Sequence, residues 1–204
     1  MNQVFSLICG WGMYVPDQKL TNFDLEKMVD TNHEWIVQRT GIEERRVAAA
    51  GETSGTMSVA ASKQALDIAG LEPTDLDLII VATSTPDYFV PALSSTVQAL
   101  LGATCPAFTM MTGCTGFVYG LVTGHQFIAT GAFKRILVVG VELITPFLDW
   151  NDRNTCVLFG DGAGAVILTP SATPRGVLSA DLGSNGELGQ HLILEGGGGV
   201  NPTL

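Results

Sequence analysis

Blocks of apolar residues, separated by polar and glycine-rich segments, divide the chain into alternating strand-like and helix-like stretches. Continuous apolar runs such as those at 78–82 and 136–141 are typical of strands buried on both faces. An apolar period of three to four residues indicates a helix over 56–70, which Gly70 ends. The whole pattern predicts helices at 21–31, 33–41, 56–70, 91–102 and 114–131, and strands within 4–12, 42–48, 75–87, 105–111, 134–143, 156–170, 176–184 and 191–196.

This order of elements predicts an α/β fold. Strands that alternate with helices, and whose apolar runs are unbroken, favour a layered structure around a largely parallel sheet. Turn-forming residues gather in SATPRG at 171–176, directly after a completed strand. We therefore predict a boundary there, with one unit at 1–170 and the start of another at 171–204.

Composition narrows the class of protein. Hydrophobic residues make up 46% of the 204-residue chain and charged residues 15%, against roughly 25% charged in an average domain. A large core is expected, together with apolar surface that packs on another unit. The net charge of −10 argues against nucleic acid and anionic membranes as partners. The longest apolar runs are too short to span a bilayer.

The four cysteines form no CxxC pair, which makes a disulfide scaffold or a zinc site improbable. The N-terminal MNQVFSLICGWG has no basic leader, so a signal peptide is not expected. The chain thus has the features of a reduced, cytoplasmic protein without a metal.

Two further motifs have ordinary structural explanations. GDGAGA at 160–165 resembles a phosphate-binding loop, but a strand-like run follows it where a dinucleotide site needs a helix. Glycines that allow close backbone packing are the favoured interpretation. His33 lacks the second histidine of a zinc motif, and a structural role is expected for His191.

Cys114, within TMMTGCTGFVYGL at 109–121, has two possible roles. An isolated cysteine is usually a small buried hydrophobe. Here, however, a predicted strand ends at Met111, a Gly113–Cys114 turn follows and a helix begins. A thiol at that point faces unpaired helix N–H groups, which favour the thiolate, and the Cys114 N–H can face an oxyanion. His125 lies on the same helix, but roughly 16 Å away at 1.5 Å per residue, so it cannot be the partner of Cys114.

Several long segments, in order from residue 1 to about 190, resemble β-ketoacyl-[acyl-carrier-protein] synthase III. They are DLEKMVDTNHEWIVQRTGIEERR, LIIVATSTPD, TGCTGFVYGL and LDWNDRNTCVLFGDGAGAVIL. The resemblance implies the thiolase-like fold, an αβαβα sandwich of two similar halves, of which this sequence holds the first half-unit and the start of the second. It also implies a homodimer.

The activity implied is that of a condensing enzyme that starts fatty acid synthesis. Acetyl-CoA, or a somewhat longer acyl-CoA, acylates Cys114. Malonyl-acyl-carrier protein then loses carbon dioxide and condenses to a 3-oxoacyl-carrier protein. Coenzyme A enters as a thioester substrate, and no cofactor or metal is implied. A priming synthase III of polyketide assembly and a long-chain acyl-CoA condensing enzyme are alternatives within the same class.

The resemblance also assigns binding residues. Trp35 and Arg153 correspond to the pair that holds the coenzyme A adenine, Thr31 and Arg39 to further coenzyme A contacts, and Phe159 to an aromatic of the catalytic cavity. A partly buried tryptophan and a surface arginine are the alternative interpretations.

The resemblance places Phe89 and Val90 in the loop that, in this family, shapes the acyl pocket across the dimer interface. The family often has an aromatic directly before the proline. The smaller Val90 therefore predicts tolerance of acyl groups longer than acetyl.

The family's decarboxylation donors, a histidine and an asparagine in PHQAN-like and GNTS-like segments, have no counterpart here. Three hypotheses follow: a part of a longer synthase, which is favoured; one half of a synthase split over two chains; or a non-catalytic subunit with an interaction role. Retention of Cys114, Trp35 and Arg153 favours catalytic ancestry. A fragment of 204 residues on its own is expected to aggregate or to need a partner.

Overall fold

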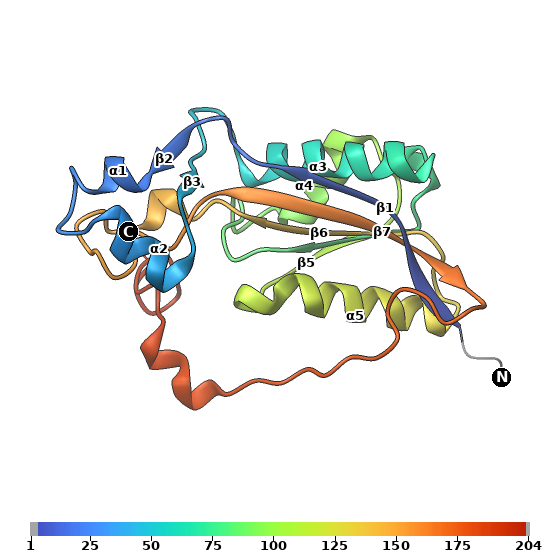
Figure 1. Cartoon of the computed structure of the whole chain (residues 1–204). Helices are drawn as coiled ribbons and strands as arrows, with labels where there is room; N and C mark the ends of the chain where they lie inside the picture. The colour runs from blue at the N-terminus through green and yellow to red at the C-terminus, as the bar shows by residue number, and fades with distance from the viewer. Residues whose placement is uncertain (1–3, 203–204) are drawn as a thin grey trace.

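The computed structural model describes residues 4–202, which form one central sheet with helices on both faces (Figure 1). The five strands lie in the order β1-β7-β6-β4-β5. Helices α3 (Ser54–Ala69) and α4 (Leu93–Leu101) cover one face, and α5 (Gly116–Ala129) covers the other. The strands are β1 (Phe5–Tyr14), β4 (Leu78–Ala82), β5 (Ala107–Met110), β6 (Ile136–Glu142) and β7 (Gly162–Ser171).

The central strands are buried on both faces, as their apolar runs predict. Along β4, Ile79 and Val81 join the core under α3 and α4, whereas Leu78 and Ile80 join the core under α5. All four side chains are at most 3% exposed. Because neighbouring side chains of a strand point to opposite faces, each unbroken run contributes to two cores.

The predicted parallel pairing is confirmed for β4, β5 and β6 only, and the sheet as a whole is mixed. Strand β4 pairs in parallel with β5 and β6, but β6–β7 and β7–β1 are antiparallel. The segment between β6 and β7, residues 143–161, contains no helix long enough to cross the sheet and return the chain to the other end. Strand β7 therefore starts where β6 finishes and runs in the opposite direction.

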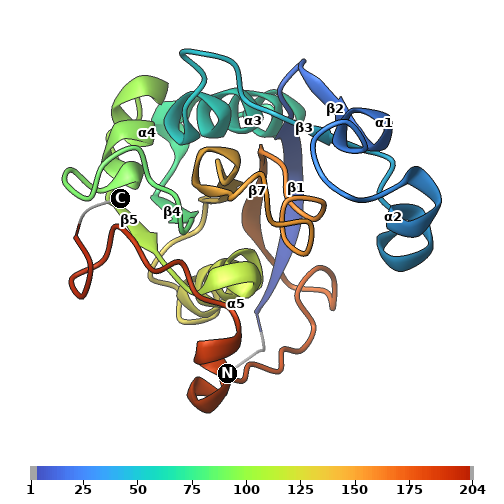
Figure 2. The same cartoon turned by 90° about the vertical axis from the view of Figure 1, so that its left-hand side faces the viewer.

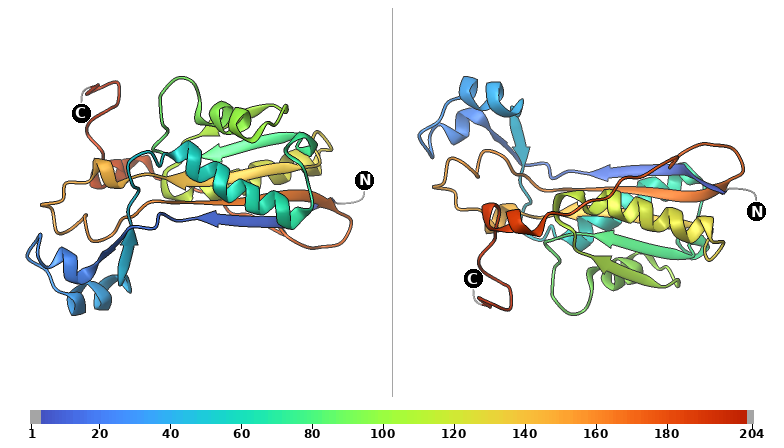
Figure 3. Two further views of the ribbon diagram at one scale, coloured as in Figure 1. Left: turned by 90° about the horizontal axis from the view of Figure 1, so that it is seen from above. Right: turned by 90° about the horizontal axis from the view of Figure 1, so that it is seen from below.

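A small lobe projects beyond the sheet, at the end where α5 begins (Figures 2 and 3). It comprises β2 (Lys19–Thr21), β3 (Glu44–Arg46), α1 (Asn22–Leu25) and α2 (His33–Thr40). Leu25 and Ile36 pack there with Cys156 and Val157 of the segment before β7. The lobe and that segment thus share one apolar core.

The predicted helix at 21–31 is much shorter than expected. The side chains of Thr21 and Asp24 form a capping box that starts α1, but the helix ends after Leu25. Asn32 is extended, and its side chain accepts the Trp35 N–H at 2.8 Å, so a second helix begins there. An N-cap needs a non-helical backbone, so the cap at Asn32 prevents one continuous helix.

The other helix ends agree better with expectation. Gly41, Gly70 and Gly102 all adopt left-handed φ values between 65° and 76° after α2, α3 and α4, as C-cap glycines do. Helix α4 starts at Leu93, two residues after the predicted Pro91.

The strands predicted at 176–184 and 191–196 are absent. Residues 172–202 run mostly exposed along the α5 side of the molecule, with a single bridge between Ser6 and Val177 and a 3-10 turn at Gly186–His191 (Figure 3). The Tyr119 hydroxyl donates to the Gly183 carbonyl at 3.0 Å and holds this segment near α5. A short apolar run forms a strand only where a neighbouring strand offers a row of backbone partners, and beyond the single bridge at Val177 none is offered here.

Candidate active site

Cys114 lies on a tight turn between β5 and α5. Gly113 has φ +60°, a conformation that other residues rarely adopt, and Gly113–Thr115 form a 3-10 turn that leads into the helix at Gly116. The strand–turn–helix arrangement predicted from sequence is therefore confirmed. A Cβ on Gly116 would lie 3.1 Å from the Ala82 Cβ, so glycine lets the turn approach β4 closely.

The cysteines differ sharply in exposure. Cys114 is exposed, whereas Cys105 and Cys156 are buried, and burial raises the pKa of both of these thiols. Buried thiols of raised pKa are poor nucleophiles. Cys9 is half-buried, and its thiol donates to the Ile167 carbonyl at 3.6 Å. Cys114 is thus the thiol best placed to react.

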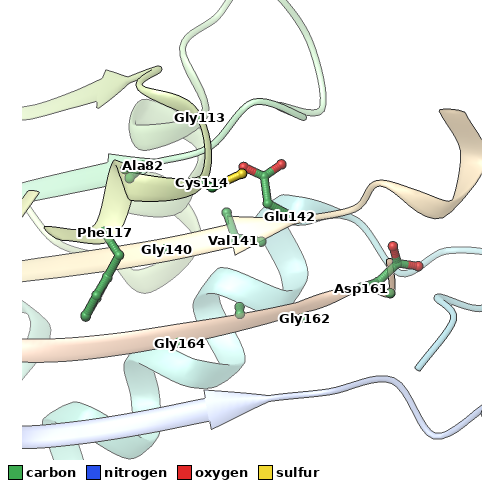
Figure 4. Close-up of a pocket in the computed structure, with 13 residues that line it drawn as sticks. Ala82, Gly113, Cys114, Phe117, Gly140, Val141, Glu142, Asp161, Gly162 and Gly164 are labelled. Atoms are coloured by element: carbon green, nitrogen blue, oxygen red, sulfur yellow. The ribbon is translucent and has the colours of Figure 1, made fainter. Parts of the chain in front are cut away.

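An open cavity of about 480 Å³ lies beside Cys114. It is framed by the ends of β4 and β6, the start of β7 and the Cys114 turn (Figure 4). Its lining is mostly glycine, alanine and valine, with one aromatic, Phe117, and two carboxylates, Glu142 and Asp161. These small side chains leave open space next to the sulfur.

The GDGAGA segment contributes backbone to this cavity, and β7 rather than a helix follows it. A Cβ on Gly160 would lie 3.0 Å from the Arg46 carbonyl oxygen, which accounts for a glycine by close packing. Asp161 accepts hydrogen bonds from the Ala48 N–H at 2.8 Å and from the Thr145 N–H and hydroxyl at 3.0 and 2.6 Å. The favoured structural interpretation of this motif agrees with that geometry.

A second group of predicted site residues gathers where the small lobe meets the segment before β7. The Arg153 guanidinium carbon lies 4.7 Å from the centre of the Trp35 ring, and that of Arg39 lies 5.1 Å from it. Arg153 also lies 3.4 Å from the Asp30 carboxylate, across 123 residues of sequence. Aromatic and guanidinium planes are both groups on which a flat base can stack.

The remaining predicted residues lie in three places. The Thr31 hydroxyl, also on the lobe, is buried without a hydrogen-bond partner. Phe159 is half-buried and directly precedes the cavity residue Gly160, although Phe117 is the aromatic that lines the cavity. Phe89 and Val90 are 78% and 86% exposed on the loop between β4 and α4.

The histidines lie apart from the cavity. The His125 Nδ1 is 2.6 Å from the Ser6 hydroxyl, as expected for a residue too far along α5 to reach Cys114. His33 stacks on Phe23, with ring centres 4.8 Å apart, and its Nδ1 is 3.3 Å from the Asn22 amide nitrogen. His191 ends the 3-10 turn in the exposed segment.

Two residues that the sequence did not single out have a clear place in these regions. The guanidinium of Arg45, which is 4% exposed, donates to the Val157 carbonyl and to the Asn22 side chain, joining the lobe to the segment that carries Arg153. Burial lowers the pKa of Arg45. Glu142 ends β6 inside the cavity. An acidic residue at the end of an otherwise apolar strand was the available signal for Glu142.

Within residues 4–202, no helix is both long and apolar enough to cross a membrane, and no group of three or more metal-ligating side chains comes together.

Comparison with known proteins agrees with this geometry. The family model for 3-oxoacyl-[acyl-carrier-protein] synthase III matches residues 108–186, which include the Cys114 turn and β7. A β-ketoacyl-[acyl-carrier-protein] synthase III of Geobacillus kaustophilus is 54% identical over 186 residues, covering 91% of this chain and 60% of the relative. That of Roseiflexus castenholzii is 50% identical over 195 residues, covering 95% and 59%.

Solved structures show the same likeness. A synthase III from Aquifex aeolicus aligns with a TM-score of 0.80 at 51% identity, over 81% of this chain and 54% of that one. The priming β-ketosynthase of the R1128 polyketide pathway aligns with a TM-score of 0.81 at 38% identity, over 85% and 52%.

The fold is therefore that of the thiolase-like condensing enzymes. Within that class, the chain belongs to the β-ketoacyl-[acyl-carrier-protein] synthase III family. It spans about three fifths of the length of the curated relatives it matches.

Proposed function

We propose that the protein acts in the first condensation of fatty acid synthesis, with Cys114 as its nucleophile. The Cys114 sulfur attacks the carbonyl of an acyl-CoA, the bond to the coenzyme A sulfur breaks, and coenzyme A leaves with the thiol proton. Malonyl-acyl-carrier protein then loses carbon dioxide, and its carbanion attacks the acyl thioester to give 3-oxoacyl-carrier protein. The main support is the exposed thiol at the start of α5, beside a cavity of about 480 Å³.

The same proposal assigns the lobe to coenzyme A. Trp35 and Arg153 would stack on the adenine, while Arg39 and Thr31 would contact the rest of the nucleotide. The Arg153 and Arg39 guanidinium carbons lie 4.7 and 5.1 Å from the Trp35 ring centre, so one aromatic ring and two cations gather at one place. An adenine that stacks on Trp35 would displace a guanidinium from the ring face. The lobe lies at the end of the sheet where α5 begins, so one extended thioester can reach both regions (Figure 3).

The condensation step needs donors that stabilise the enolate formed on decarboxylation. None of the three histidines supplies one, since His33 and His125 are engaged elsewhere and His191 lies on the exposed segment. We therefore assign the acylation half-reaction to the residues described here. Donors of the second half-reaction are proposed to lie on further residues of the same protein or on a partner.

A homodimer is part of this proposal. The loop of Phe89 and Val90 places two large apolar side chains almost fully in solvent, which is typical of an interface. Phe159 and this loop would bound the acyl pocket. The proposed location is the cytoplasm, because a nucleophilic cysteine must stay reduced and all four cysteines are free thiols.

Priming of polyketide assembly is the second candidate, and the likeness to the R1128 priming synthase supports it. The two roles differ in the acyl group that loads fastest. A preference for acetyl-CoA or for a short branched acyl-CoA favours fatty acid synthesis. Condensation with malonyl carried by a polyketide carrier protein, but not with malonyl carried by a fatty acid carrier protein, would favour the alternative.

The acylation proposal is tested by intact mass spectrometry after incubation with acetyl-CoA. One acetyl adduct is expected, located on Cys114 by peptide mapping and absent from Cys114→Ser. The matched control is Cys9→Ala, in which the adduct should remain. An unmodified wild-type protein, or an adduct that survives Cys114→Ser, would exclude the proposed role.

A further inference from the structure

The charged groups of the cavity are few, and they differ in orientation. Cys114, Glu142 and Asp161 are the lining residues whose side chains ionise. Asp161 is 5% exposed and is occupied by the three hydrogen bonds from Ala48 and Thr145. Glu142 is half-exposed, and its carboxylate and the Cys114 sulfur point toward one another (Figure 4). Glu142 is therefore the charged group that an acyl chain on the sulfur would meet.

The Glu142 carboxylate is held in place from both sides. One oxygen accepts the Ser84 N–H at 2.7 Å, and the other accepts the Thr85 hydroxyl, also at 2.7 Å. The Thr85 oxygen in turn accepts the Leu143 N–H at 2.8 Å. These contacts fasten the end of β6 to the loop after β4, so the carboxylate cannot swing out of the cavity without breaking them. Its charge is a fixed feature of the space beside the sulfur.

We propose that Glu142 determines which acyl groups Cys114 accepts, by repelling those that carry a negative charge. The rest of the lining is glycine, alanine, valine and phenylalanine, and it offers no cation to compensate a second anion. In a partly buried cavity two like charges repel more strongly than in water. Neutral acyl groups load, and acyl groups that end in a carboxylate are excluded.

This inference rests on the proposed function and adds a reason for it. Both substrates of the proposed reaction are thioesters, and a malonyl thioester carries a carboxylate where an acyl-CoA primer carries none. A free Cys114 must attack only the neutral one. A fixed anion beside the sulfur makes that distinction before any condensation occurs. Glu142 is thus a specificity-determining residue of the acylation step.

The variant that tests this is Glu142→Gln, which removes the charge and keeps the shape. The glutamine oxygen can accept the Ser84 N–H. Its amide nitrogen can donate to the Thr85 oxygen, which has a second acceptor site beside the Leu143 N–H. Asp67→Asn, on an exposed residue of α3, is the control for loss of one negative charge elsewhere.

The direct measurement compares two alkylating agents of nearly equal size, neutral iodoacetamide and anionic iodoacetate, with modification of Cys114 followed by peptide mapping. In Glu142→Gln the ratio of the iodoacetamide rate to the iodoacetate rate should fall about fivefold or more, whereas Asp67→Asn should leave it nearly unchanged. High salt should lower the ratio in the wild-type protein, which requires no variant. An unchanged ratio in both experiments would overturn the inference.

The second measurement compares butyryl-CoA with succinyl-CoA as acyl donors in the full chain. Wild type should load butyryl and exclude succinyl, and Glu142→Gln should narrow that difference. Equal discrimination by both proteins would also count against Glu142. If no thioester acylates wild type, the proposed function fails, while the alkylation ratio still decides the role of Glu142.

Discussion

Replacing Arg45 by methionine should destabilise the lobe that carries Trp35. Arg45 donates from Nε and Nη2 to the Val157 carbonyl at 3.0 and 2.6 Å, and from Nη1 to the Asn22 side-chain oxygen at 2.5 Å. Val157 is 1% exposed and Asn22 0%. Methionine fills much of the space but donates nothing, so two buried acceptors lose their partners.

The expected size follows from those two acceptors. A buried polar group left without a partner costs about 1–3 kcal/mol, which gives roughly 2–6 kcal/mol for the pair. Methionine also removes a buried cation that has no carboxylate partner, and this relief offsets part of the loss. We expect the free energy of unfolding to fall by about 3 kcal/mol. The free energy of unfolding of Arg45→Lys should lie between those of wild type and Arg45→Met, because one ammonium group cannot reproduce the planar, forked donors of the guanidinium.

Equilibrium urea denaturation, followed by tryptophan fluorescence and circular dichroism, measures the change. Hydrogen exchange then locates it: amides of β2, β3 and residues 150–160 should exchange faster, while those of β4 and β6 keep their protection. Arg46→Met is the matched control. Arg46 is the neighbouring residue on β3, donates to the Pro16 carbonyl at 2.9 Å and pairs with Glu44 on the surface, so it should cost under about 1 kcal/mol.

A loss below about 1 kcal/mol in Arg45→Met, or equal losses in the two variants, would refute the assignment of a buried link between lobe and sheet. Loss of protection throughout β4 and β6 would show that Arg45 supports the whole fold instead of the lobe.

Three further outcomes are expected. Hydrogen bonds from the Thr21 hydroxyl and from Lys27 lower the pKa of Asp24 from 3.8 to about 2. The stabilising effect of the Asp24 carboxylate is therefore complete above pH 3.8 and is lost as the pH falls toward 2. The stability of Asp24→Asn, measured by acid unfolding, should depend less on pH in that window. Gly124→Val should destabilise the protein by about 2 kcal/mol or more in urea denaturation, because a Cβ there would lie 2.9 Å from the Leu168 side chain across the α5–sheet contact. The control Val118→Ala, at an exposed position of the same helix, should cost little. Trp35→Ala should raise the dissociation constant for coenzyme A about tenfold in calorimetry, since a stacked base is worth about 1–3 kcal/mol, and an unchanged constant would remove Trp35 from the proposed site.

Local pattern predicted the elements well wherever one residue type fixes a boundary. Glycines 41, 70 and 102 end their helices as expected, and the apolar run at 136–141 forms the central strand β6. Pattern failed where an outcome depends on partners distant in sequence. The apolar run within 191–196 has no strand beside it, and the direction of β7 depends on the path taken by residues 143–161.

The site shows the same division. The Cys114 turn was predictable because its chemistry is local: a glycine at positive φ, a thiol and a helix start follow one another directly. Glu142 was not, because its importance comes from Ser84 and Thr85, which hold it, and from Cys114, which faces it. Those residues converge because β4, β5 and β6 are parallel neighbours, so their carboxyl ends meet at one edge of the sheet.

That parallel core also explains why a cavity can exist beside a nucleophile in so small a unit. Three consecutive parallel strands need α4 and α5 as crossovers on opposite faces, and α5 returns from β5 to β6 directly over the sheet. Gly120 and Gly124 let that helix lie close, because a Cβ on either would come within 2.9 Å of a strand side chain. Close packing along α5 fixes its first turn against Ala82, and the thiol of Cys114 is thereby held at the edge where Glu142 ends β6. A Gly124→Ala variant should therefore acylate Cys114 more slowly than wild type, even at temperatures where the protein remains folded. Unchanged acylation kinetics in this variant would show that packing at Gly124 does not control the position of the thiol.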